Sequence, residues 1–453
     1  MTSQEFIDRV GRFIARNNLL ENDKLVLATV SGGADSVSLL LALRGLGYRC
    51  MAAHCNFGLR GSESDRDEQF VRSLCAQLKV PLEVRYFDVQ SYAKKHGASV
   101  EMACRELRYA WFQELAAEHN CQAIAVAHHR NDNVETFLLN ALRGTGIDGL
   151  RGMLPLGNQP VPVVRPLLCV SRGEILDFLQ AENQPFVTDS SNLVPDVKRN
   201  RLRNVVLPAV RVQFADADAR LSDTVAHVAD DDALLQELTE KAKIGIITTR
   251  NDGFEVDLKG LFGFVNRTSL LFRWLKPCGF SHVQCEQIVC AAMAGNATGK
   301  QWNTSTHTLS LNRGKLEVFV LKRQLECSHA INLKSNEVTT PIRIKIERVN
   351  GSQFTPSICD GRRVVALNPQ VLQCREVVLR HWRDGDRFAP FGMRGSKLVS
   401  DLFTDMKLGL RAKRETWLMV ADGKILWVVG HRASRHFAVP KGSADYLLLT
   451  FEQ

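Results

Sequence analysis

The residues best suited to chemistry follow the first apolar run of the chain. Residues 25–30 (LVLATV) lead directly into Ser31, Gly32, Gly33, Ala34, Asp35 and Ser36, and a helical pattern follows. The glycines permit a close backbone approach to a ligand, and the start of a helix presents free N–H groups to an anion. Serine and aspartate also occur at ordinary helix N-caps, but a cap does not need all six positions. The loop therefore predicts a phosphate site, with Mg²⁺ separating Asp35 from the phosphates.

A second polar cluster follows the apolar run 123–127 and reads HHRNDNVE over residues 128–135. On a helix, His128, Asp132 and Glu135 would share one face. This face would lie at the C-terminal edge of the sheet, where open α/β sheets bind ligands. Such a cluster could hold magnesium or receive the amine of a substrate. The alternative is a capping box made by Asp132 and Glu135, with exposed histidines.

Several arginines lie in segments that could contact an anionic ligand. They are Arg60 in HCNFGLRGSESD, Arg105 and Arg108 in EMACRELRY, and Arg203 in KRNRLRN, which comes shortly after TDSSN at 188–192. The ordinary alternatives are a loop whose Ser62 caps the next helix, an i,i+4 pair of Glu101 with Arg105, and a solvated basic run. Near a phosphate loop, contact with a triphosphate or RNA is favoured for the basic run.

The elements that must position these residues alternate along the first part of the chain. Strand-like runs at 25–30, 50–55, 82–87, 123–127 and 161–164 are separated by helical patterns at 36–44, 68–77, 101–118 and 134–142. This alternation predicts an α/β fold with a parallel sheet wound with helices. We expect three domains: an α/β domain at 1–212, a mainly helical middle domain at 213–340 and a small β-rich domain at 341–453. The clearest hairpin is TWLMVADGKILWVVG, which turns at Asp422 and Gly423.

Composition and charge narrow the class of protein. With 58 Lys+Arg against 49 Asp+Glu, the net charge is +9, which suggests an anionic partner. Residues 375–441 hold 14 Lys+Arg and 7 Asp+Glu, so that 14 − 7 = +7 lies in this stretch. The sequence contains no run of 18 apolar residues, so it predicts no membrane span. It also shows no signal-peptide pattern. The 12 cysteines contain no C-x-x-C pair, which favours reduced thiols in a cytoplasmic protein.

Together these motifs resemble the tRNA(Ile)-lysidine synthetase family of the PP-loop ATPases. The resemblance runs in order through SGGADS, the HCNFGLRGSES loop, EMACRELRY, HHRNDNVET and the basic run at 198–204. It resumes at RDGDRFAPFGMRGSK (383–397) and ILWVVGHR (425–432), which are similar to that family's C-terminal tRNA-binding domain. Two positions depart from the family pattern: Asn131, where an acid is usual, and Phe57, where histidine is common.

The resemblance implies an ATP-dependent ligase that joins L-lysine to the wobble cytidine of the CAU anticodon of tRNA(Ile). ATP would adenylate the cytosine carbonyl oxygen, and the lysine amine would then displace AMP. Residues 31–36 would hold ATP, Asp35 and Asp132 would hold Mg²⁺, and Asp132 and Glu135 would serve the metal or the lysine. Arg203 would stabilise charge on the phosphates. The substrates would contact Arg60, Arg105, Arg108 and His129.

The alternatives are an ATP-dependent tRNA 2-thiolation enzyme and a non-catalytic RNA-binding protein with a relict nucleotide fold. Thiolation enzymes usually need catalytic cysteines, often in a C-x-x-C pair, and the intact SGGADS loop argues against a relict. A homodimer is possible, and the sequence does not determine the oligomeric state.

Overall fold

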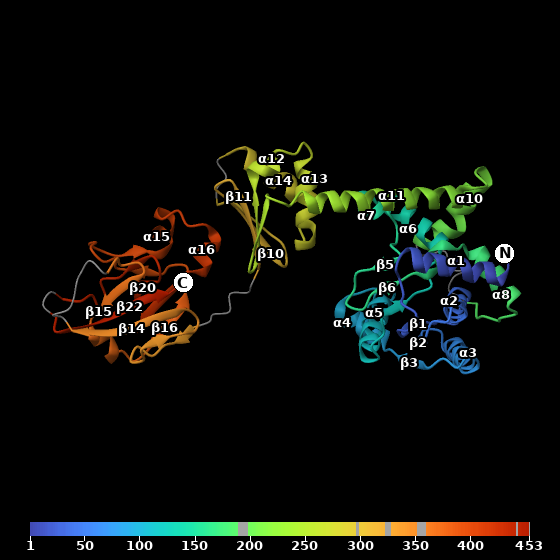
Figure 1. The fold of residues 1–453 in the computed structure, drawn as a ribbon, viewed down its shortest axis with the longest axis horizontal. Helices are drawn as coiled ribbons and strands as arrows, with labels where there is room; N and C mark the ends of the chain where they lie inside the picture. The colour runs from blue at the N-terminus through green and yellow to red at the C-terminus, as the bar shows by residue number, and fades with distance from the viewer. Residues whose placement is uncertain (189–197, 296–298, 322–327, 351–358, 441–442, 453) are drawn as a thin grey trace. The chain divides into compact units, whose positions relative to one another are not determined.

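The computed structural model describes residues 1–453 except 189–197, 296–298, 322–327, 351–358, 441–442 and 453. Most of the TDSSN segment singled out in the sequence, residues 189–192, is therefore outside the described residues. The chain divides into two compact units, Met1–Glu237 and Leu238–Gln453 (Figure 1). Among the helices that the structure describes, none is long and apolar enough to cross a membrane.

A six-stranded sheet with the order β3-β2-β1-β4-β6-β5 forms the centre of the first unit. All neighbouring strands pair in parallel except β5, which runs antiparallel to β6. The predicted parallel sheet is confirmed, and the short β5 adds a strand that the sequence pattern does not indicate. The strands are β1 (Val26–Thr29), β2 (Cys50–Asn56), β3 (Leu82–Tyr86), β4 (Ala123–Ala125), β5 (Leu156–Gly157) and β6 (Val163–Val164).

The order of the strands explains where a site can form. From β1 the chain adds β2 and β3 on one side, and it later adds β4 and β6 on the other. Ligands bind at such a switch point, outside the carboxyl ends of the strands. The loops that follow β1 and β4 carry the two polar clusters found in the sequence, so the sheet brings them to the same edge.

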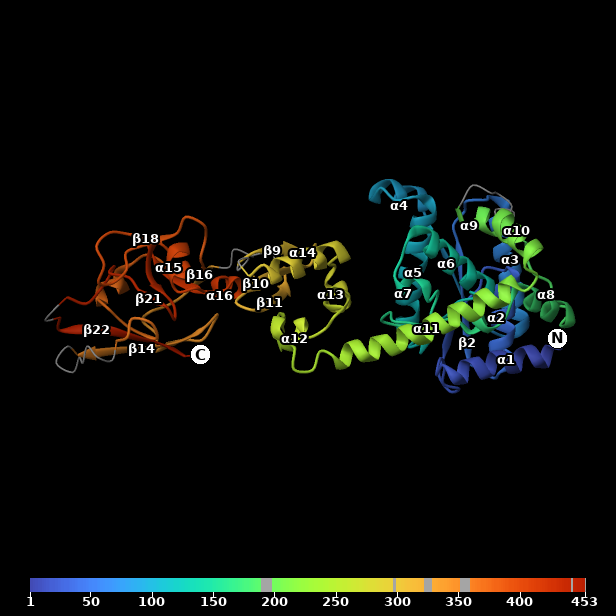
Figure 2. The same cartoon turned by 90° about the horizontal axis from the view of Figure 1, so that it is seen from above.

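Helices cover both faces of this sheet because β1 is apolar on both of its sides. Val26 and Ala28 belong to a core shared with α1 (Ser3–Arg16), α2 (Ala34–Gly45), α3 (Ser62–Leu78) and α8 (Arg172–Ala181). Leu27 belongs to a second core, shared with α5 (Val100–Glu118). Figure 2 shows α5 and this group of helices on opposite sides of the sheet. The remaining helices are α4 (Val89–His96), α6 (Arg130–Arg143), α7 (Ile147–Leu150), α9 (Lys198–Arg201) and α10 (Leu207–Gln213), with a π-helical turn at Leu202–Val206 between the last two.

The middle of the chain is helical, as predicted, and it also carries an antiparallel sheet. The long polar helix α11 (Ala217–Lys241) opens this part of the chain. The sheet has the order β7-β8-β11-β10-β9 and packs against α13 (Arg267–Leu275) and α14 (His282–Met293). The other elements here are α12 (Leu258–Phe262), β7 (Ile247–Arg250), β8 (Gly253–Asp257), β9 (Gln301–Asn303), β10 (His307–Asn312) and β11 (Lys315–Val320).

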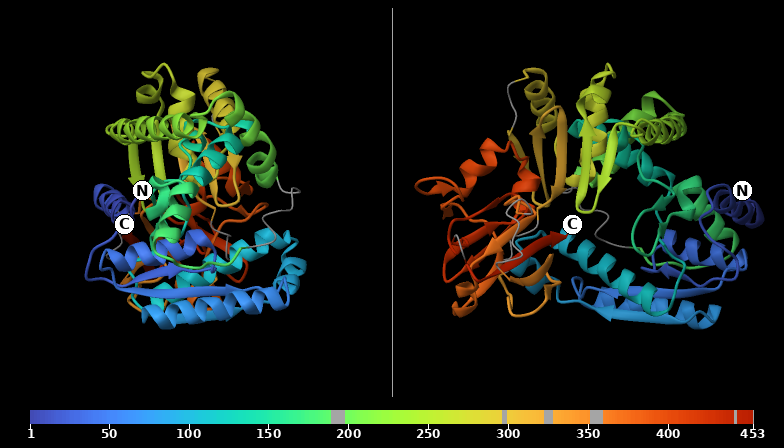
Figure 3. Two further views of the ribbon diagram at one scale, coloured as in Figure 1. Left: turned by 90° about the vertical axis from the view of Figure 1, so that its right-hand side faces the viewer. Right: turned by 60° about the vertical axis from the view of Figure 1, so that its left-hand side comes forward.

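The C-terminal part, orange to red in Figure 3, contains two antiparallel sheets that share one core. The predicted hairpin is present as β19 (Trp417–Ala421) and β20 (Lys424–Val428), and Asp422 and Gly423 both have positive φ at its turn. The sheets contain β12 (Ser328–Ala330), β13 (Glu337–Val338), β14 (Arg343–Asn350), β15 (Val364–Leu367), β16 (Val377–His381), β21 (Arg432–Ala433) and β22 (Asp445–Glu452). Outside them lie β17 (Arg387–Phe388), β18 (Lys397–Leu398), α15 (Val399–Asp405) and α16 (Leu410–Glu415).

Candidate active site

The phosphate loop lies where β1 passes into α2. Gly33 is the N-cap of α2, and its position offers no side chain to cap the helix. Gly32 has a φ of +91°, in the left-handed region that favours glycine. The Ser36 hydroxyl donates to the Gly33 carbonyl oxygen at 2.9 Å and accepts from the Ser31 backbone N–H at 3.1 Å. Ser36 thus stabilises the turn through hydrogen bonds to the backbone of Ser31 and Gly33. The backbone N–H groups at the N-terminus of α2 remain available to an anion.

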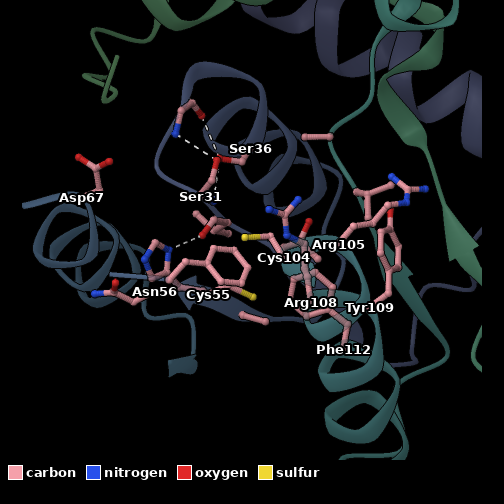
Figure 4. Close-up of a pocket in the computed structure, with 18 of the residues that line it drawn as sticks. Ser31, Ser36, Cys55, Asn56, Asp67, Cys104, Arg105, Arg108, Tyr109 and Phe112 are labelled. Carbon is pink, nitrogen blue, oxygen red and sulfur yellow. Dashed lines mark hydrogen bonds between the residues drawn. The ribbon is translucent and has the colours of Figure 1, made fainter. Parts of the chain in front are cut away.

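This loop opens into a pocket of about 760 Å³. In Figure 4, Ser31 and Ser36 lie on the loop side, while Arg105, Arg108 and Tyr109 come from α5 across the pocket. Eight of the predicted site residues line it: Ser31, Gly33, Asp35, Ser36, Arg60, Arg105, Arg108 and Asp132. The other predicted residues lie on the phosphate loop and the start of α2 (Gly32, Ala34), at the N-cap and within α6 (His129, Glu135), and on the helical run that packs on α6 (Arg203).

The wall from α5 combines cations with aromatic rings. The Arg105 guanidinium lies 5.0 Å from the centre of the Tyr109 ring, and that of Arg108 lies 5.3 Å from the centre of the Phe57 ring. Stacking of this kind keeps a guanidinium extended while its N–H groups stay available. Arg60 instead donates from Nη2 to Asp67 Oδ2 at 2.9 Å. The α5 wall is therefore suited to a planar, anionic ligand such as a nucleotide.

The structure corrects the predicted arrangement of the second cluster. Helix α6 begins at Arg130, so His128 precedes the helix and does not share a helical face with Asp132 and Glu135. A capping box does form, but between His129 and Asp132: Asp132 Oδ2 accepts from the His129 backbone N–H at 3.1 Å, and His129 Nδ1 accepts from the Asp132 N–H at 3.4 Å. The start of the helix, two residues later than the predicted face requires, accounts for the difference.

The two predicted metal ligands, Asp35 and Asp132, both lie near Nε2 of His129. His129 Nε2 is 3.7 Å from Asp35 Oδ1 and 3.5 Å from Asp132 Oδ2. Burial by itself would raise the pKa of Asp132, but His129 and its backbone N–H hold that pKa below the usual value. Asp35 and Asp132 thus reach the same place from the loops after β1 and β4.

Glu135 is buried and is held by two arginines of the basic run. Its carboxylate is only 2% exposed. Arg203 donates from Nε to Oε1 at 2.6 Å and from Nη2 to Oε2 at 2.9 Å, and it also reaches Asp132 Oδ1 at 2.9 Å. Arg199 donates from Nε to Glu135 Oε2 at 2.9 Å. The sequence prediction had not singled out Arg199, although its spacing of four residues from Arg203 on a helix was a usable signal.

Asn131 has a structural role that an acid could not fill. Its side-chain carbonyl accepts from the Arg172 backbone N–H at 2.9 Å, and its amide donates to Asp218 Oδ2 at 3.3 Å. A carboxylate at this position would repel Asp218 instead of donating to it. The Arg172 side chain in turn pairs with Asp35. No sequence signal identifies Arg172, because it follows Asp35 by more than a hundred residues and comes from α8.

His128, which the sequence places in one cluster with Asp132 and Glu135, also lies at the site. It lines the pocket, and its Nδ1 is buried without a hydrogen-bond partner among the described residues. Burial lowers the pKa of His128 to about 4, against the opposing effect of Asp132. The ring is therefore neutral at pH 7.

The acidic residues of the site could bind magnesium only if a bound substrate supplied further oxygen ligands. Within the described ranges, no group of at least three His, Cys, Asp or Glu side chains is placed to hold a metal ion. Mg²⁺ commonly uses one or two carboxylates and completes its shell with substrate phosphates and water. Asp35 and Asp132 beside a phosphate loop fit that pattern.

Two cysteines, Cys55 and Cys104, line the pocket, and both are held in the protonated thiol form, which is a poor nucleophile. Burial raises the pKa of Cys55 to about 12 and also raises that of Cys104. All cysteines that the structure describes are free of disulfides.

Comparison with known proteins gives a consistent result. A family model described as a PP-loop domain matches residues 2–210. Models described as a TilS substrate binding domain and a TilS substrate C-terminal domain match residues 249–321 and 377–449. These three matches follow the same order as the elements described above.

Curated relatives are similar over nearly the whole chain. The tRNA(Ile)-lysidine synthase of Parabacteroides distasonis is 36% identical over 445 residues, which are 98% of this chain and 99% of the relative. That of Bacteroides thetaiotaomicron is 37% identical over 434 residues, 95% of this chain and 96% of the relative. The enzyme of Bacillus subtilis is 28% identical over 470 residues, with 98% of each chain covered. The chain therefore belongs to the tRNA(Ile)-lysidine synthase family.

Proposed function

We propose that this protein is an ATP-dependent ligase that joins L-lysine to the wobble cytidine of the CAU anticodon of tRNA(Ile), forming lysidine and releasing AMP and pyrophosphate. The observation that carries this proposal is a single pocket with the uncapped N-terminus of α2 on one side and the cation–aromatic wall of α5 on the other. One side suits the phosphates of ATP, and the other suits a nucleobase with its phosphates.

Activation precedes bond formation because the cytosine carbonyl oxygen is a poor leaving group. Residues Ser31, Gly32, Gly33, Ala34 and Ser36 hold ATP, and the carbonyl oxygen attacks the α-phosphorus so that pyrophosphate leaves. Asp35 and Asp132 would hold Mg²⁺, which supplies positive charge to the phosphates when bound. Arg105 and Arg108 hold the cytidine, and Arg60 contributes positive charge at the edge of the pocket.

The lysine amine must be neutral to attack, although its reference pKa is about 10.4. Asp132 and Glu135 are both engaged by Arg203, so they contribute mainly charge and orientation. The amine releases its proton to solvent as the new C–N bond forms and AMP departs, because His128, with a pKa of about 4, is too weak a base to hold it at pH 7. Arg203 keeps the two carboxylates in place and stabilises negative charge on the departing phosphate.

We assign catalysis to residues 1–212, tRNA contact to the middle part at 213–340, and tRNA binding to the C-terminal part at 341–453, in the cytoplasm. The excess of Lys and Arg in 375–441 supports this assignment. Because phosphate contacts release counterions, affinity for tRNA should fall steeply with salt.

The deciding assay combines ATP, radiolabelled lysine and tRNA(Ile) bearing CAU, with a CAU-bearing methionine tRNA as the control. We expect lysine to enter only the isoleucine tRNA and AMP to form in step. Asp35→Ala, Glu135→Ala and Arg203→Ala should each abolish incorporation; unchanged incorporation in all three would refute the site.

The thiolation alternative is not favoured, because Cys55 and Cys104 are held as protonated thiols. Substituting both cysteines by serine should leave lysine incorporation largely intact. A wild-type protein that binds tRNA but forms no AMP would instead support the non-catalytic alternative.

A further inference from the structure

A second pocket, of about 410 Å³, lies within the second unit. One side is the turn between β10 and β11, which carries Arg313, and the other is the segment from Lys407 to Lys413, which leads from α15 into α16. No acidic residue lines this pocket in the described part of the chain. The cations that line it are Arg313, Lys407 and Lys413, and none of the described acidic residues forms an ion pair with them. The lining therefore carries three positive charges that a ligand could neutralise.

The carboxylate of Glu317 lies next to the pocket and accepts hydrogen bonds from two side chains of its own hairpin. Glu317 accepts from Asn312 Nδ2 at 2.8 Å and from the Ser310 hydroxyl at 3.2 Å. Ser310 is buried, and both donors line the pocket. The carboxylate also lies close to the opposite side, since a Cβ added at Gly409 would be 3.1 Å from Glu317 Oε1. Glu317 therefore offsets part of the positive charge, and an excess of two cations remains around the pocket.

The two sides of the pocket are held together by specific contacts. Arg411 pairs with Asp252, and the Arg414 guanidinium lies 5.0 Å from the centre of the Phe319 ring. The approach is close at Gly409, where an added Cβ would lie 2.3 Å from Asn312 Nδ2. The cations therefore stand around a shaped cavity and not on a flat, solvated surface.

We propose that this pocket binds one backbone phosphate of the tRNA, with the adjoining ribose against its aliphatic side. The cations suit a phosphodiester, Leu311 and Leu408 suit a sugar face, and Gln301 offers hydrogen bonds to a 2′-hydroxyl. The proposal rests on the proposed function for the identity of the RNA. It adds a defined contact where the middle and C-terminal parts meet within the second unit.

The test measures binding of a tRNA(Ile) transcript to the full chain at several salt concentrations. The variants are Arg313→Gln, Lys407→Gln, Lys413→Gln and the triple substitution, with Lys334→Gln as the control because Lys334 is exposed in the same unit but does not line the pocket. A lost phosphate contact reduces the slope of log K against log salt by about 0.9, which corresponds to about fivefold in affinity at 0.15 M salt. We expect that change for the triple variant and none for the control. Equal binding by the triple variant and the wild type would overturn the proposal.

A second variant separates the shape of the pocket from its charge. Gly409→Ala keeps every cation but forces the two sides apart, and the φ of Gly409 is −65°, which alanine adopts without strain. We expect weaker tRNA binding at unchanged net charge, with the melting temperature measured alongside. Wild-type affinity in a normally folded Gly409→Ala protein would count against a shaped site.

Inorganic phosphate and the lysine assay distinguish the other outcomes. If inorganic phosphate raises the melting temperature of the wild type but not of the triple variant, while tRNA binding is equal in both, the pocket takes free phosphate and the proposal is wrong. If the wild type incorporates lysine but the pocket variants bind tRNA normally, only this inference fails. If the wild type incorporates no lysine, the proposed function itself fails.

Discussion

Replacing Arg203 by alanine should destabilise the first unit and stop lysine incorporation. Arg203 makes two hydrogen bonds to Glu135 and one to Asp132, and Glu135 is almost completely buried. Without Arg203, the buried carboxylate keeps only Arg199 as its arginine partner among the described residues, and Asp132 lies 4.0 Å from Arg199 Nη2.

The expected loss follows from the burial of the two partners. Removing one member of a buried ion pair typically costs about 3–5 kcal/mol. The Arg203 side chain is 37% exposed and Arg199 remains in place, so we expect about 2 kcal/mol. For a unit of 237 residues, this corresponds to a melting temperature lower by about 4–8 °C.

The matched control is Arg211→Ala. Arg211 is 38% exposed, close to Arg203, but its partner Asp218 is 34% exposed, so the loss should stay below about 1 kcal/mol. Thermal and denaturant unfolding of both variants should be measured beside lysine incorporation. Equal destabilisation of the two variants would refute the argument that the burial of Glu135 sets the cost.

Three further perturbations test the loop, the histidine and the cysteines. Gly32→Ala should weaken ATP binding measured by calorimetry and destabilise the first unit by about 1–2 kcal/mol, because the φ of +91° suits only glycine; unchanged ATP affinity would contradict the role of the turn. Since the pKa of His128 is about 4 in the folded protein and about 6.5 when unfolded, its contribution to stability is complete above pH 6.5 and is lost as the pH falls toward 4, by on the order of 3 kcal/mol. His128→Gln should flatten this part of the stability–pH profile, and an unchanged profile would argue against a buried neutral ring. Iodoacetamide at pH 8 should label the exposed Cys290 well before Cys55, whose pKa is about 12; mass spectrometry of digested samples would show the order, and early labelling of Cys55 would contradict its burial.

The order of the secondary structure in the first unit was accessible from sequence, because strands buried on both faces are short apolar runs bounded by turn residues. The phosphate loop was accessible for a similar reason, since all its residues are consecutive and its geometry is local. The hairpin at Asp422 and Gly423 also depends on residues adjacent in sequence. The strands β7, β8 and β9 were not accessible, because half-buried strands of three to five residues leave little periodicity to detect.

The charge state and partners of the site were decided by tertiary structure. Whether His128 or His129 faces the pocket depends on the residue at which α6 begins, and α6 packs through Val134 against Leu202 and Leu207, which are distant in sequence. The pairing of Asp35 with Arg172, and of Glu135 with Arg199 and Arg203, joins segments that are far apart in the chain. The sequence alone therefore determined which chemical groups are present and in which family they occur. Only the folded chain decided which carboxylates are neutralised and which nitrogen remains unpartnered, because burial and charge pairing depend on neighbours that are distant in sequence.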